Sequence, residues 1–192
     1  SLSNGISQIY NLSQNDDVKT TIKTLSLLGI KIYKKDEKII VDPRKFAANL
    51  PPEIFINCQN SGSTARLMSG ISSLVNKKII IDGSARLCQR PMRGLISALR
   101  KMGITIKELK RANYLPVEIR GGKIRGGKIP IDTSQSSQFV SSIMLIAHYA
   151  DEDTTLIIKN AHSVPYVDLT SHIMKKFGVL VINNGNTYHI AH

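Results

Sequence analysis

The stretch that decides the fold is RPMRGLISALRKMGITI, residues 90–106. Its apolar residues recur at helical spacing up to Leu99, Gly103 stands where a helix would end, and a β-branched run typical of a strand follows. Two other stretches have the same design, DDVKTTIKTLSLLGIKI at residues 16–32 and PYVDLTSHIMKKFGVLV at residues 165–181. The chain therefore contains three helix–glycine–strand segments.

These segments recur at a regular distance. Their glycines, Gly29, Gly103 and Gly178, lie 74 and 75 residues apart. A serine-rich helical pattern alternates with them, SGSTARLMSGISSLV from Ser61 and SSQFVSSIMLIAHYA from Ser136, and these two starts are also 75 residues apart. Repetition at a fixed period indicates that one supersecondary unit is used several times.

Short strand-like segments fill the intervals between the helices. They read KIIVD, KKIIID, LPVEI, GKIPID, TTLIIKN and TYHIA. We therefore expect an α/β fold, a pseudo-threefold domain of repeated βαβ-rich units with helices inside and sheets outside. The repeat also predicts a third serine-rich helix ahead of Ser1. We expect residues 1–192 to form a single domain that lacks its first serine-rich helix, in a larger protein that supplies a partner domain.

Composition narrows the function classes. The net charge of +12 favours anionic ligands, either nucleic acid or small multiply charged anions. Aromatic residues make up only 5% of the chain and tryptophan is absent, which argues against a base-stacking surface for nucleic acid. Cys58 and Cys88 form no disulfide framework and the histidines show no paired spacing, so we expect a cytoplasmic protein without a metal site.

Small polar residues gather at the two serine-rich helix starts, in NSGSTAR at residues 60–66 and TSQSSQ at residues 133–138. The first amides of a helix lack intrahelical partners and favour an anion. Simple capping is the alternative for each run taken alone. Arg90, beside Pro91 at a third predicted helix start, suits bidentate binding of a phosphate or carboxylate, or otherwise a surface ion pair.

Four motifs in order, NSGSTARLMSGI, RLCQRPM, SSQFVSSIMLIA and SVPYVDLTSHIMKKFGV, resemble the 5-enolpyruvylshikimate-3-phosphate synthase family, and the likeness runs from about Ser1 to Ala191. That family has two domains, each built from three similar units. The resemblance implies transfer of the enolpyruvyl group of phosphoenolpyruvate to the 5-hydroxyl of shikimate 3-phosphate, a step of aromatic amino acid biosynthesis. It implies no metal or organic cofactor, no membrane partner, and a target of glyphosate.

The resemblance also implies roles for individual residues. Shikimate 3-phosphate would be held by Ser136, Ser137, Gln138, Ser163 and Tyr166. Phosphoenolpyruvate would be held by Gly62, Arg90 and Gln138. Asn60 and Arg66 match a motif that shapes the loop and are expected to support it. Taken alone, Tyr166 would read as a core tyrosine and Ser163 as a turn residue.

Some features depart from the family or are absent. Ser63 stands where many members have threonine, which would tune either the phosphoenolpyruvate pocket or the response to glyphosate. Asp132 and Asp168 could act as a general base by residue type, but neither matches a catalytic position of the family. The remaining catalytic groups would come from the missing helix and the partner domain, so we expect the isolated chain to have little or no synthase activity.

Three alternatives remain open from the sequence. The sister enzyme that acts on UDP-N-acetylglucosamine has a reactive cysteine where this chain has Ala85, and Cys88 reads as an ordinary thiol. An RNA 3′-phosphate cyclase-like or nucleic-acid-binding domain would suit the basic charge. A catalytically dead domain kept for binding or assembly is the third alternative.

Overall fold

The computed structural model describes residues 2–160 and 164–192, and the chain divides into three successive units. The first comprises β1 (Ser7–Tyr10), α1 (Asp16–Leu27), β2 (Lys31–Lys35) and β3 (Lys38–Asp42). The second comprises β4 (Glu53–Asn57), α2 (Gly62–Ser72), β5 (Lys78–Asp82), α3 (Ala85–Cys88), α4 (Arg93–Lys101), β6 (Thr105–Glu108) and β7 (Val117–Arg120). The third comprises β8 (Gly127–Asp132), α5 (Gln138–Ala147), β9 (Thr154–Lys159), α6 (Val164–Lys176), β10 (Val181–Asn183) and β11 (Thr187–Ile190).

Each unit forms its own sheet, and the sheets share one strand order. The second sheet runs β4-β5-β7-β6 and the third runs β8-β9-β11-β10, each with a parallel first pair and antiparallel pairs after it. The first sheet, β1-β3-β2, is antiparallel throughout and corresponds to the last three strands of the others. Within the described residues it has no counterpart of β4 and β8.

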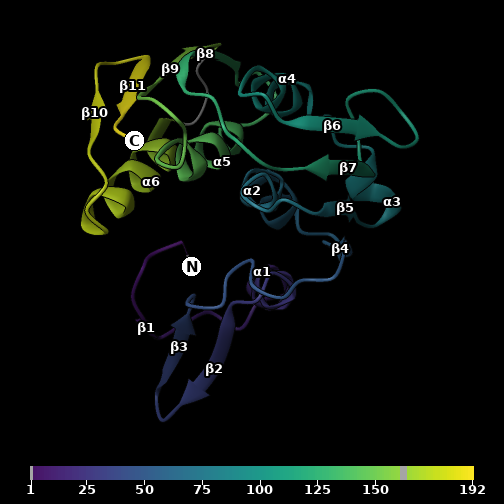
Figure 1. The fold of residues 1–192 in the computed structure, drawn as a ribbon, viewed down its shortest axis with the longest axis vertical. Coiled ribbons are helices and arrows are strands. Elements are labelled where there is room, and N and C mark those ends of the chain that lie inside the picture. The colour runs from purple at the N-terminus through teal and green to yellow at the C-terminus, as the bar shows by residue number, and fades with distance from the viewer. Residues whose placement is uncertain (1, 161–163) are drawn as a thin grey trace.

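The helices α2 and α5 pack against each other at the centre, and the sheets lie around them (Figure 1). Gly70 on α2 allows this close approach, because a Cβ there would lie 2.6 Å from the backbone oxygen of Ser142 on α5. The Ser142 hydroxyl donates a hydrogen bond to the backbone oxygen of Arg66 at 2.7 Å. The expected arrangement, with helices inside and sheets outside, is confirmed for this part of the fold.

Glycine ends the three outer helices, as the sequence predicts. Gly29, Gly103 and Gly178 have φ values of +88°, +85° and +87°, a left-handed conformation that strains residues with a Cβ. The predicted helix start at Pro91 is wrong, because α4 begins only at Arg93. The amide of Met92 donates to the oxygen of Asn113, and this bond ties Met92 to a neighbouring loop in a non-helical conformation.

Two strands and a helix were not predicted from the sequence. The strand β4 reads EIFIN and pairs in parallel with β5, and β1 is a short strand whose residues are mostly exposed. The helix α3 is a single turn capped by Ser84, whose hydroxyl accepts from the amide of Leu87.

In the part of the chain that the structure describes, no helix is both long and apolar enough to cross a membrane.

Candidate substrate-binding site

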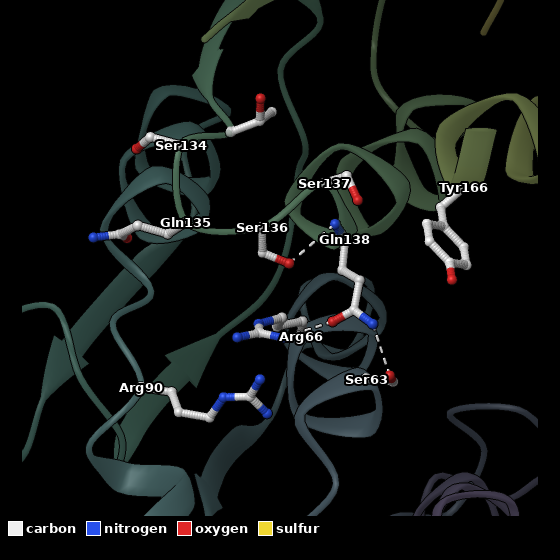
Figure 2. A pocket seen from close by; sticks show the side chains of 10 residues that line it. Ser63, Arg66, Arg90, Ser134, Gln135, Ser136, Ser137, Gln138 and Tyr166 are labelled. Carbon is white, nitrogen blue, oxygen red and sulfur yellow. Dashed lines mark hydrogen bonds between the residues drawn. The ribbon is translucent and has the colours of Figure 1, made fainter. Parts of the chain in front are cut away.

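The starts of α2 and α5 meet at a cavity of about 510 Å³ (Figure 2). The lining residues are Ser63, Arg66, Arg90, Thr133, Ser134, Gln135, Ser136, Ser137, Gln138 and Tyr166. The two polar runs that the sequence singled out therefore lie side by side. All ten side chains are polar, and two of them carry a positive charge.

The helix start of α2 is capped in the ordinary way. The Ser61 hydroxyl accepts a hydrogen bond from the amide of Thr64 at 3.2 Å. At α5, the Ser136 hydroxyl accepts from the amide of Gln138 at 3.2 Å, whereas the N-cap residue Ser137 makes no capping bond with its side chain. Capping therefore accounts for Ser61 and Ser136, and it leaves the Ser137 hydroxyl, at the cavity wall, available for a ligand.

A hydrogen-bonded bridge joins the two helix starts, as Figure 2 shows. Nη1 of Arg66 on α2 donates to Oε1 of Gln138 on α5 at 2.7 Å. Nε2 of Gln138 then donates to the hydroxyl of Ser63, back on α2, also at 2.7 Å. The Gln138 amide is thus held in one orientation by partners on both sides.

Arg66 carries its charge into the interior of the protein. The residue is only 6% exposed, and its guanidinium lies over the Phe139 ring, 5.6 Å from the ring centre. Among the described residues, no carboxylate forms an ion pair with it. Burial, and secondarily the charge of Arg90, lower the pKa of Arg66 to about 10. A buried cation without a counter-ion is costly, so the site favours an anion.

Arg90 approaches the same point from the loop between α3 and α4. Its side chain is exposed, and its guanidinium lies over the backbone of Gly62, at the start of α2. A Cβ at Gly62 would lie 2.5 Å from Nη1 of Arg90 and 3.2 Å from Nη1 of Arg66. Glycine at this position therefore makes room for two guanidinium groups beside one helix start.

The other predicted site residues fall in different places. Tyr166, on the first turn of α6, lines the cavity and is 66% exposed, so the alternative of a core tyrosine is wrong. Asn60 does not line the cavity; its side-chain oxygen accepts from the Ser84 hydroxyl and ties the loop to the start of α3. Ser163 lies outside the described residues.

Known proteins resemble this chain over nearly its whole length. The profile of the family described as EPSP synthase (3-phosphoshikimate 1-carboxyvinyltransferase) matches residues 1–191. The chain belongs to the EPSP synthase family. A 3-phosphoshikimate 1-carboxyvinyltransferase from Buchnera aphidicola subsp. Cinara cedri is 39% identical over 183 residues, which are 94% of this chain and 42% of that protein.

Other relatives agree with this assignment. A protein with the same description from Yersinia pseudotuberculosis is 32% identical over 201 residues, which cover 97% of this chain and 46% of that protein. A solved structure of EPSP synthase from Acinetobacter baumannii superposes with a TM-score of 0.84 at 24% identity, covers 98% of this chain and 42% of its own, and so shows the same fold. The chain spans less than half the length of these relatives.

Six of the ten lining residues are ones that the family resemblance named, and four further residues complete the lining. These are Ser63, Thr133, Ser134 and Gln135. The polar run at residues 133–138 was the available signal for the last three. Thr133 has a structural task as well, because its hydroxyl lies within hydrogen-bonding distance of the backbone oxygens of Lys159, at 3.1 Å, and Asn160, at 2.8 Å.

The two carboxylates considered as general bases have structural partners. Asp132 accepts from the amide of Ser134 and the side chain of Asn160, and these bonds lower its pKa. Asp168 accepts from the hydroxyl of Tyr188 at 2.9 Å. Neither lines the cavity, and no acidic residue of the described chain does. The described residues also contain no cluster of three metal-binding side chains.

The two enzymatic alternatives receive no support. Burial and the neighbouring Asp82 raise the pKa of Cys88, whose thiol donates to Asp82 at 3.2 Å, so this cysteine is not activated as a nucleophile. The family and the relatives point to EPSP synthase, and nothing in the structure favours the RNA 3′-phosphate cyclase alternative.

Proposed function

We propose that this chain is one domain of an enzyme that transfers the enolpyruvyl group of phosphoenolpyruvate to the 5-hydroxyl of shikimate 3-phosphate, in the cytoplasm. The observation that carries the proposal is the cavity between α2 and α5. It combines two guanidinium groups with hydroxyl and amide groups, and no acidic side chain of the described residues lines it. Such a lining suits two small, multiply charged anions.

The lining divides between the two substrates. Ser136, Ser137, Gln138 and Tyr166 lie on the side of α5 and α6 and would hold shikimate 3-phosphate. Ser163, from the segment between β9 and α6, would join them. Arg90 would hold phosphoenolpyruvate above Gly62, and Gln138 lies between the two groups, where it can reach either substrate.

A second part of the enzyme would complete the site. Exposed Arg90 and Tyr166 line the cavity, so it is accessible to solvent, and the described residues of its lining include no carboxylate and no histidine. We propose that a partner domain of the same enzyme covers the cavity, supplies the groups that move protons, and excludes water when it closes. The 192-residue chain alone is then expected to bind anions with little or no turnover.

Steady-state kinetics of the complete enzyme test the assignment of the two substrates. Replacing Arg90 by Ala removes a charge-assisted contact worth about 1.5–3 kcal/mol, so the Michaelis constant for phosphoenolpyruvate should rise roughly ten- to a hundredfold. The Michaelis constant for shikimate 3-phosphate should change little. Arg90→Lys should recover only part of the loss, because an ammonium group lacks the planar fork.

Ser137→Ala and Ser163→Ala serve as the reciprocal variants. Each loses a neutral hydroxyl worth about 1 kcal/mol, so binding of shikimate 3-phosphate should weaken about fivefold while phosphoenolpyruvate kinetics stay near wild type. The assignment is wrong if Arg90→Ala leaves phosphoenolpyruvate kinetics unchanged, or if the arginine and serine variants weaken both substrates equally. Exposed Arg86, on α3 and outside the cavity, offers the control for loss of one positive charge.

A further inference from the structure

The hydrogen bonds of the bridge between α2 and α5 all run from donor to acceptor in one direction, from Arg66 through Gln138 to Ser63. The guanidinium group of Arg66 imposes this direction. A guanidinium group only donates hydrogen bonds, so the atom of Gln138 that faces Nη1 of Arg66 at 2.7 Å must be the oxygen. The amide nitrogen of Gln138 is then turned toward Ser63. Because that nitrogen also only donates, the Ser63 oxygen is forced to accept, at 2.7 Å.

This direction determines where the Ser63 proton can go. The Ser63 oxygen accepts from Gln138, and the described residues contain no acceptor for its own hydrogen. Ser63 is half-buried at the cavity wall, so its O–H is free to turn into the cavity and donate to a ligand there. At the other end of the bridge, Arg66 donates one hydrogen bond to Gln138. Its positive charge has no counter-ion among the described residues, and the residue is only 6% exposed.

We propose that Arg66, Gln138 and Ser63 form a one-directional hydrogen-bond relay that makes the Ser63 hydroxyl a donor to a bound phosphate group. In the relay, Arg66 is a positioning residue for Ser63 as well as a source of charge, beyond a role in shaping its loop. Donors then face the ligand from the Ser63 hydroxyl, from Arg90 and from the start of α2. The inference rests on the proposed anion site and adds two residues to it.

The relay also makes the site bind anions in preference to neutral polar ligands. A serine with a free hydrogen-bonding choice could accept from a ligand hydroxyl as easily as it donates to a phosphate oxygen. Here Gln138 occupies one of the two acceptor positions of the Ser63 oxygen. Rotation of the amide is blocked because it would turn an NH₂ group toward the Arg66 guanidinium, so Gln138 cannot take the Ser63 hydrogen away from a ligand. The site is therefore set for an acceptor-rich anion before the ligand arrives.

A double-mutant cycle on the 192-residue chain tests the relay, with inorganic phosphate as the probe and calorimetry as the measurement. In the wild-type background, Ser63→Ala should weaken phosphate binding about fivefold, the usual worth of a neutral donor. In an Arg66→Met background the Gln138 amide is free to rotate. Ser63→Ala should then change the remaining affinity less than about twofold.

Two controls keep the result interpretable. Gln138→Met breaks the relay at its centre without a change in charge and leaves the Ser63 hydroxyl free to rotate, so it should reduce the effect of Ser63→Ala even if Arg66→Met fails to fold. Exposed Ser97 and Arg86 lie outside the cavity, and Ser97→Ala and Arg86→Met should leave phosphate affinity within about twofold of wild type.

The outcomes separate the relay from the anion site itself. Equal effects of Ser63→Ala in all three backgrounds, or no effect in the wild type, would overturn the relay while phosphate binding by the wild type would uphold the site. A wild-type chain that binds no phosphate would overturn both. The assignment of the two substrates is tested separately, by the kinetics of Arg90→Ala.

Discussion

Arg66 is a buried cation, and no carboxylate of the described residues forms an ion pair with it. At this scale the sequence identifies residue types and family positions, and Arg90, Gln138 and Tyr166 were placed at the cavity on that basis. The burial of Arg66 could not be predicted, because it depends on Gln138 and Phe139, which lie on another helix of the fold. A local motif carries no information about such partners.

Gln138→Glu should make the protein more stable and weaken its binding of phosphate. The carboxylate would face Arg66 where the amide oxygen now accepts at 2.7 Å, and it would stand at the start of α5, where the helix dipole favours a negative charge. We expect the free energy of unfolding to rise by about 1 kcal/mol, and phosphate affinity to fall at least about tenfold because the new carboxylate repels the anion and cancels one of the two positive charges of the site. Denaturant unfolding and calorimetry of the same protein measure both effects. Parallel losses of stability and affinity would contradict this expectation.

At the scale of elements, the helix–glycine–strand segments and most strands could be predicted, because capping glycines and apolar spacing are local signals. The strand β4 and the helix α3 were missed for different reasons. The strand depends on pairing with β5, and the helix is a single turn that follows from the Ser84 cap. The crossing of α2 and α5 was equally hidden, because it requires Gly70 to meet Ser142 across the core.

Two substitutions on α2 should have opposite effects on stability. Gly70→Ala would place a Cβ 2.6 Å from the backbone oxygen of Ser142, and the resulting overpacking should cost about 1–2 kcal/mol despite the better helix propensity of alanine. Ser72→Ala should stabilise by about 1 kcal/mol, because the Ser72 hydroxyl is buried and has no hydrogen-bond partner among the described residues. Chemical denaturation of the Gly70→Ala and Ser72→Ala variants measures both free energies of unfolding. If Ser72→Ala also destabilises the protein, the unpartnered Ser72 hydroxyl is not a source of instability.

Ionisation of Tyr188 should make the protein less stable at alkaline pH. Burial, followed by the bond that its hydroxyl donates to Asp168, raises the pKa of Tyr188 to about 12 from an ordinary value of 10. The protonated tyrosine is favoured in the folded state, so this stabilisation is complete below pH 10 and is lost between about pH 10 and 12. Tyr188→Phe should be about 1 kcal/mol less stable at pH 8, and its unfolding free energy should fall less steeply above pH 10. Parallel pH profiles of wild type and variant would contradict this assignment.

At the scale of the whole molecule, the repeat predicted three related units, and the sheets show how far they agree. In the second and third sheets a parallel first strand precedes the three antiparallel strands, and the first sheet shows only the latter. Two of the three outer helices pack on the first strand of the following unit, α1 on β4 and α4 on β8. The helix α6 has no such strand to cover among the described residues, and its Leu169, Ile173 and Phe177 are 55%, 46% and 57% exposed.

We propose that a strand and a serine-rich helix, equivalent to β8 and α5, cover this face in the complete enzyme. An apolar groove of about 670 Å³ lies there, between α6 and the first residues of the chain, and Ile71 of α2 and Leu145 of α5 also line it. In the pseudo-threefold repeat, such a helix would lie against these two central helices. The same packing that joins α2 to α5 would then close the core.

A fusion should reproduce this completion. A second copy of Gly127–Ala147 placed directly before Ser1 supplies a strand that can pair with β1 and a helix that can enter the groove. Ile173 and Phe177 line the groove and are about half exposed, so covering them contributes roughly 1 kcal/mol each. The thermal midpoint should therefore rise by roughly 5 °C, and binding of a hydrophobic dye should fall. A control fusion with polar residues on the apolar face of the added helix should do neither. If both fusions leave the midpoint and the dye signal of the 192-residue chain unchanged, the groove does not accept the repeated helix, and the exposed face of α6 belongs to a different contact.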